Sequence, residues 1–222
     1  MLQASTLKFL KDIKKNNQRD WFEKNRSRYE AAKEDMMQLV DAVIKQLGRK
    51  DPTIAPLVAK DCLYRINRDV RFSKDKSPYK HHFAASLIRG GKKSDFGGYY
   101  IHIEPGESII GGGKYQTTPE MIRKIRQEID YSWDEFKKII TSKKFVAAFG
   151  DIDKSPEFSL SREPKGYEKE NPAIDYIKLK SWITFASLTD ADLTGKDLVK
   201  KIVTTLEALQ PLLNFLNRAI AE

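Results

Sequence analysis

The chain has 222 residues, with 40 Lys and Arg against 31 Asp and Glu and a formal net charge of +9. This length suits one large domain or two small ones, and a hydrophobic content of 40% is enough for a packed core. The basic balance favours anionic partners such as nucleic acid, phosphorylated metabolites or acidic protein surfaces, and it carries no information on the fold.

Cysteine content and hydropathy indicate the cellular compartment. The single cysteine, Cys62, excludes an intrachain disulfide and predicts a reducing compartment. The N-terminal stretch lacks the long apolar segment of a secretory signal, and no apolar run reaches the roughly 20 residues that a membrane helix needs. We therefore expect a cytoplasmic protein with no membrane partner, and the sequence carries no signal for an oligomeric state.

The N-terminal region predicts two helices. Ser5 or Thr6 can cap a short helix that ends near residue 16. A long helix is expected over residues 25–48, because apolar residues recur there at steps of three and four. A loop with two prolines follows and leads into a strongly basic stretch.

The middle of the chain predicts strands. Alternating or apolar runs bounded by turn residues define them, and the fourth run contains Gly111–Gly113. Glycines inside a strand indicate a bulge or a close approach of another backbone. The predicted strands cover residues 62–66, 83–89, 96–104, 108–114 and 182–188.

Helices are expected again after residue 117. Thr118 can cap a helix with proline at its first position, Ser132 begins a capping-box pattern, and Ser142 can cap a third helix that stops at Gly150. An irregular segment follows. A helical pattern then covers residues 194–220, where Pro211 should kink or split the helix.

Helices at both ends with strands between them predict an α+β fold, in which a mainly antiparallel central sheet is flanked by N- and C-terminal helices. No repeat, low-complexity tract or flexible linker interrupts the chain. We therefore expect a single domain over residues 1–222.

Residues 62–83 hold the densest group of cations, interleaved with aromatic rings. Arginine forks bind two oxygens of a phosphate or carboxylate at once, so this stretch predicts an anion-binding site, with a second basic segment as a flap over it. The residues predicted to bind the anion are Arg65, Arg68, Arg71, Lys74, Lys80, Arg162 and Lys165. In the alternative interpretation, Asp69, Asp75 and Glu104 neutralise several of these cations in an internal salt-bridge network.

His102 and Glu104 are the candidates for proton transfer, because strand alternation places them on one face with Arg65 and Tyr100. His81 and His82 are adjacent, so a strand would point them in opposite directions, and the sequence predicts no metal site. The glycine triplet lacks the spacing of a P-loop or a dinucleotide-binding motif, so the sequence leaves the cofactor unknown.

Several motifs together resemble the domain-of-unknown-function 2461 family over nearly the whole chain. They are Asn17, Trp21–Phe22, Asn25, Tyr29, the run from Arg65 to Lys80, Gly111–Gly113 and Arg162–Gly166. The resemblance implies a single-domain protein of a kind found in bacteria and fungi, and it implies no reaction, cofactor or catalytic residue. Within the central run, we expect Asn67, Asp69, Asp75 and Tyr79 to maintain the shape of the motif.

Three functions remain open from the sequence. The first is a pocket for a phosphorylated or other anionic small molecule, which is catalytic if His102 or Glu104 transfers protons. The second is a nucleic-acid-binding module, with Tyr79 or Tyr100 stacking on bases. The third is a protein-interaction module whose charged motif is purely structural. We favour the pocket because the cations are concentrated, mixed with acids and set beside glycine and proline turns.

Overall fold

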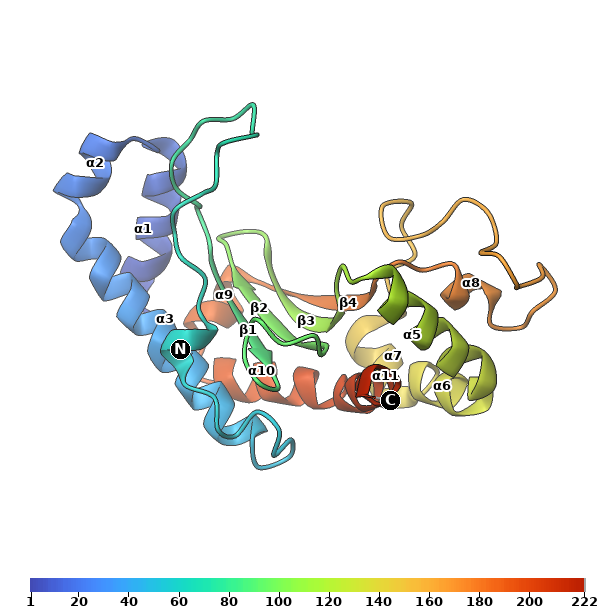
Figure 1. Ribbon diagram of the computed structural model, residues 1–222. Helices are drawn as coiled ribbons and strands as arrows, with labels where there is room; N and C mark the ends of the chain where they lie inside the picture. The colour runs from blue at the N-terminus through green and yellow to red at the C-terminus, as the bar shows by residue number, and fades with distance from the viewer. Residues whose placement is uncertain (222) are drawn as a thin grey trace.

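The computed structural model describes residues 1–221 and shows helices around one central sheet (Figure 1). The N-terminal helices are α1 (Ala4–Lys15), α2 (Arg19–Lys24), α3 (Arg26–Leu47) and α4 (Ala59–Cys62). The strands are β1 (Phe83–Ile88), β2 (Gly98–Ile103), β3 (Ser108–Lys114) and β4 (Trp182–Leu188). The remaining helices are α5 (Pro119–Tyr131), α6 (Trp133–Ile140), α7 (Lys143–Phe149), α8 (Ile174–Ile177), α9 (Asp190–Thr194), α10 (Leu198–Glu207) and α11 (Gln210–Ala221).

The sheet has the order β1-β2-β3-β4, and every neighbouring pair is antiparallel. Helices α10 and α11 run along one face of it, α3 stands at the β1 edge, and α5 to α8 lie beyond the end of the sheet where β3 stops and β4 begins (Figure 1). The α+β prediction, with an antiparallel central sheet flanked by N- and C-terminal helices, is therefore confirmed.

Alternation along β2 separates the two faces of the sheet. Tyr99, Ile101 and Ile103 are almost fully buried and belong to the hydrophobic core, whereas the residues between them are only partly buried. β1 continues this arrangement because Phe83 pairs with Ile103 and Ala85 with Ile101. The core thus lies on the helix-covered face, and the opposite face carries polar and aromatic side chains.

The strand expected at residues 62–66 is wrong. Cys62 instead ends the short helix α4, and Leu63 makes only an isolated bridge with Ala85. Five residues of alternating polarity also fit a short helical turn followed by an extended loop, so the pattern was too short to identify a strand. The other four predicted strands are present, and β3 and β4 have the predicted bounds.

Several predicted helix ends follow local chemistry. The Thr118 and Ser142 side chains accept hydrogen bonds from Met121 N and Phe145 N as N-caps. The helical pattern around Pro211 is split into α10 and α11, as predicted.

Two predicted side-chain capping interactions are wrong. Ser132 Oγ donates to Glu128 Oε1 instead of capping α6. At the start of α1, Gln3 is the cap residue, and the Thr6 hydroxyl donates to Asp35 Oδ2 on α3. In both places the hydroxyl that was expected to cap the helix donates instead to a carboxylate of a different helix.

Among residues 1–221, no helix combines the length and the hydropathy needed to cross a lipid bilayer.

Candidate functional site

The face of the sheet that turns away from α10 and α11 forms the floor of a cavity of about 640 Å³. Two long segments rise on either side of it (Figure 1), and each contributes to the lining: Tyr64 and Lys80 from residues 63–82, and Phe158 from the segment before α8. The floor includes Ser86 of β1 and Tyr100 of β2. Side chains from distant parts of the sequence therefore share one concave site.

The glycines of β3 allow the strands to meet closely beneath this cavity. A Cβ atom on Gly111 would lie 2.0 Å from Thr184 O, and one on Gly113 would lie 1.9 Å from Trp182 O. Gly113 also has a φ of 130°, a backbone conformation that residues other than glycine rarely adopt. The expectation of a close backbone approach is confirmed, and it leaves Gly112 and Gly113 as bare backbone in the wall of the cavity.

Three lysines supply positive charge to the cavity: Lys80, Lys92 and Lys114. Lys114 is buried, and its ammonium group donates to Asp95 O. The ammonium groups of Lys80 and Lys92 lie 5.5 Å and 5.2 Å from the centre of the Tyr64 ring.

Burial shifts the pKa values of side chains that line the cavity. It lowers the pKa of Lys80, and the neighbouring charges of Arg65 and Lys92 lower it further. Burial also lowers the pKa of Lys114, partly offset by the charge of Asp95. Burial raises the pKa of Tyr100 to about 12, so this phenol stays protonated at neutral pH.

A cluster of histidines surrounds Glu104 at one end of the sheet. Glu104 follows β2 directly, and its carboxylate side chain is only 6% exposed. Its backbone is fixed by Ser108, whose Oγ accepts from Glu104 N and donates to Glu104 O. Its Oε2 lies 3.2 Å from His102 Nε2, and the other ring nitrogen of His102 lies 3.2 Å from the Tyr100 hydroxyl.

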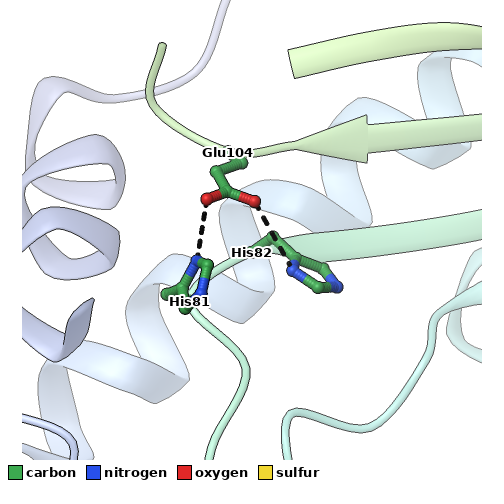
Figure 2. Close-up of side chains that lie close together, drawn as sticks. All are labelled: His81, His82 and Glu104. Atoms are coloured by element: carbon green, nitrogen blue, oxygen red, sulfur yellow. Dashed lines mark ion pairs between the residues drawn. The ribbon is translucent and has the colours of Figure 1, made fainter. Parts of the chain in front are cut away.

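His81 and His82 approach the same carboxylate (Figure 2). His81 Nδ1 lies 2.8 Å from Glu104 Oε1, and His82 Nδ1 lies 3.7 Å from Oε2. The expectation that these adjacent side chains diverge is wrong, because residues 81 and 82 form a bend before β1 rather than extended strand. Their ligand atoms and the Glu104 carboxylate lie within 4.8 Å of one another.

Lys14 of α1 completes the cluster. Its ammonium group lies 3.1 Å from Glu104 Oε1 and 3.8 Å from the exposed Glu107. Burial alone would raise the pKa of Glu104, but hydrogen bonds from Lys14 and His102 outweigh it, so the net shift is downward. The pKa of His82 is lowered to about 4, first by burial and then by the charge of His102.

Arg68 and Arg71 are occupied by acids of their own loop. Arg68 pairs with Asp75 and also donates to Ser77 O, and Arg71 binds both oxygens of Asp69, at 2.9 Å and 2.7 Å. Hydrogen bonds from Ser77, followed by the one from Arg68, hold the pKa of Asp75 far below its usual range. Part of the salt-bridge alternative is thus present, although Glu104 bonds to Lys14 and the histidines instead.

The other predicted anion-binding residues are spread over the surface. Arg65, Lys74, Arg162 and Lys165 are exposed, and Lys80 is the member of the predicted set that lines the cavity in the described chain. Glu163 pairs with Lys178 at 3.7 Å, which ties the 162–166 turn to α8. Anion binding by the exposed members stays a prediction.

The residues expected to shape the central motif lie where they can do so. Asn67 forms an isolated antiparallel bridge with Tyr79, which closes the loop between them. Asp69 and Asp75 bind the loop's arginines. Tyr79 is buried and stacks on Phe22 of α2, with ring centres 4.1 Å apart.

The sequence identified His102, Glu104 and Tyr100 as neighbours but missed Lys14, His81 and His82. The missing signal was the register of β1 against β2. Since Phe83 pairs with Ile103, His82 and Glu104 lie just beyond the last pair of the ladder, and His82 Nδ1 is 3.7 Å from Glu104 Oε2. The position of Lys14 follows only from the packing of α1 beside this end of the sheet.

Comparison of the chain with known proteins identifies its family. No curated protein and no solved structure matches the chain. The profile of one family, described as "Conserved hypothetical protein (DUF2461)", matches residues 5–215. The match covers nearly the whole chain and agrees with the resemblance seen in the sequence motifs. The protein therefore belongs to the DUF2461 family of conserved hypothetical proteins.

Proposed function

We propose that the protein binds an anionic small molecule with an aromatic ring, such as an aromatic or nucleoside phosphate, in the cavity on the open face of the sheet. The observation that carries this proposal is the combination of Lys80, Lys92 and Lys114 around one cavity of about 640 Å³. Against these three cations the lining contains a single carboxylate side chain among the described residues, that of Asp95. An anion entering the cavity meets a net positive charge.

Partial burial strengthens this attraction. Lys114 is buried and Lys80 half-buried, so water screens their charges less than it screens those of exposed lysines. Burial lowers the pKa of both groups, which means that a neighbouring negative charge would stabilise their charged form. The bare backbone at Gly112 and Gly113 leaves room for a ligand to lie against the strands.

Aromatic side chains favour a ligand with a planar ring. The cavity is lined by Tyr64, Phe96, Tyr100, Tyr115, Phe158 and Phe185. Tyr100 and Phe185 stand edge to face at 6.1 Å between ring centres, and Tyr115 and Phe158 do so at 6.0 Å. Rings that pack in this way present apolar surfaces on which a planar group can stack.

A thermal melt with defined probes tests the proposal. Phenyl phosphate and AMP should raise the melting temperature of the wild type in a concentration-dependent way, and inorganic phosphate should raise it less. Lys92→Met should reduce this response at least several-fold, whereas Lys93→Met, which changes an exposed lysine next to it, should not. If no aromatic phosphate stabilises the protein beyond chloride of equal ionic strength, the cavity is not an anion site.

The nucleic-acid alternative is tested in parallel. Binding through several phosphates makes affinity fall with salt, with a log–log slope of about −0.7 per contact for single strands. The local pairing of Arg68 and Arg71 with loop acids reduces the charge available for such contacts and supports the small-molecule proposal. Salt-sensitive oligonucleotide binding that Lys92→Met leaves unchanged would favour the alternative.

A further inference from the structure

The geometry points to a binding site for one divalent transition-metal ion, of the Zn²⁺ or Fe²⁺ class, held by His81 Nδ1, His82 Nδ1 and the Glu104 carboxylate. This inference goes beyond the proposed anion binding and does not depend on it. It starts from the convergence of two imidazole nitrogens and a carboxylate from separate segments, with all ligand atoms within 4.8 Å of one another (Figure 2).

The distances suit a metal after small movements. Metal bonds of about 2.0–2.2 Å to nitrogen and oxygen separate neighbouring ligand atoms by roughly 3–3.5 Å. His81 Nδ1 and His82 Nδ1 lie 2.8 Å and 3.7 Å from the oxygens of Glu104, values that bracket this range. Side-chain shifts on the order of an ångström bring all three ligands to one ion.

The state of His81 Nδ1 is the second observation. This nitrogen is buried, yet it has no hydrogen-bond partner in the described chain, even though Glu104 Oε1 lies 2.8 Å away. The contact is short but not directed as a hydrogen bond. Buried polar atoms are almost always satisfied, so an exception calls for an explanation such as an ion. A cation bound to both atoms satisfies the nitrogen and the carboxylate together.

The surroundings of Glu104 are those of an oriented ligand. When the Tyr100 hydroxyl donates to His102 Nδ1, His102 Nε2 is the nitrogen that donates to Glu104 Oε2, at 3.2 Å. Hydrogen bonds of this kind fix the direction of metal-binding carboxylates. The Ser108 bonds to both backbone groups of Glu104 restrain the residue further.

Lys14 is the group that opposes the ion, because its ammonium lies 3.1 Å from Glu104 Oε1. Its side chain is 49% exposed, and Glu107 lies 3.8 Å from the same ammonium. Lys14 therefore has an alternative partner when Oε1 turns to a metal. Two imidazoles and one carboxylate form the ligand set that Zn²⁺ and non-haem Fe²⁺ sites use, with further positions left for water or a ligand.

His82 also lines the cavity of the proposed anion site. An ion at this position would therefore stand at the edge of that cavity, where a bound anion can reach it. The metal site is nevertheless tested without any anion, so that the two proposals stand or fall separately.

The test is a titration of full-length protein without a histidine tag, freed of metal by EDTA and exchanged into chloride buffer. We expect one Zn²⁺ per chain by calorimetry, and visible d–d absorption bands when CoCl₂ is added, which Zn²⁺ then removes. Glu104→Gln and His81→Asn should each weaken Zn²⁺ binding by at least about 100-fold, the upper end of the loss caused by removing a supporting partner of a metal ligand.

Matched controls make the outcome decisive. Glu157→Gln, at an exposed carboxylate in the segment before α8, should bind Zn²⁺ like the wild type. His81 is partly exposed, so His81→Asn remains informative if Glu104→Gln fails to fold. The inference is overturned if the wild type shows neither Co²⁺ bands nor Zn²⁺ uptake. It is also overturned if His81→Asn binds Zn²⁺ with the affinity of the wild type. A persisting response to phenyl phosphate would then show that only the metal site is wrong.

Discussion

The side-chain amide of Asn17 pairs with the backbone of Tyr79 through two hydrogen bonds. Asn17 Nδ2 donates to Tyr79 O at 2.8 Å, and Tyr79 N donates to Asn17 Oδ1 at 3.0 Å. The amide thus replaces a neighbouring strand for this residue and fastens the 67–80 loop to the segment after α1. It also holds the Tyr79 ring against Phe22, directly before Lys80 and His81 in the chain.

Asn17→Ala should lower the free energy of unfolding by about 1–3 kcal/mol, because two partly buried backbone groups lose their partners. Amide hydrogen exchange should also accelerate over residues 67–80. Asn16→Ala is the matched control, since the exposed Asn16 side chain donates within its own helix end, to Asp12 O. Equal exchange in the two variants would contradict the role of Asn17 as a clamp.

Gly113→Ala should destabilise the protein by more than about 4 kcal/mol or prevent folding, because its Cβ would lie 1.9 Å from Trp182 O in the sheet. Gly91→Ala separates the clash from backbone strain. Gly91 also has a positive φ, 89°, but nothing lies within 4 Å of its Cβ position, so a cost of only about 1–2 kcal/mol is expected. Similar melting temperatures for the two variants would show that the strands can separate at β3.

Arg71→Ala should have nearly the same melting temperature as the wild type, because its ion pair with Asp69 is exposed. Arg68→Ala should cost more, about 1–2 kcal/mol, since Arg68 is 27% exposed and bonds both Asp75 and Ser77 O. Both variants should keep the wild-type response to phenyl phosphate. Loss of that response in Arg71→Ala would move the anion site from the cavity to the loop.

Asp192 should contribute stability that disappears in acid. Hydrogen bonds from Lys201 and from Thr189 lower its pKa to about 2, and the Thr189 bonds form a capping box at α9. A carboxyl whose pKa is lower in the folded state stabilises the protein above its unfolded pKa of roughly 4 and loses this contribution as pH falls toward the folded value. Loss of the cap in Asp192→Asn should cost about 1 kcal/mol at pH 7.

The measurement is the melting-temperature difference between wild type and Asp192→Asn across pH. It should be largest near neutrality and shrink between about pH 4 and pH 2. Glu157→Gln, at an exposed carboxylate in the segment before α8, serves as the control. A difference that stays constant down to pH 2 would show that the Asp192 charge makes no contribution.

Local sequence patterns determined most of the secondary structure. The long α3, the strands β3 and β4, the caps at Thr118 and Ser142 and the break near Pro211 were all predictable. These features depend on residues within one or two turns of each other or on alternation within one strand. The prediction of a strand at residues 62–66 was wrong because an alternating run this short does not distinguish a strand from a helical turn followed by a loop.

The sequence by itself determined the family, the α+β class and the placement of His102 with Glu104 on one sheet face, because each depends on motifs or on alternation along a single strand. Only the tertiary structure decided what surrounds that pair. The β1–β2 register brings His82 near Glu104, and the packing of α1 brings Lys14 to the same carboxylate. Such contacts depend on distances between segments remote in sequence, which no local pattern encodes.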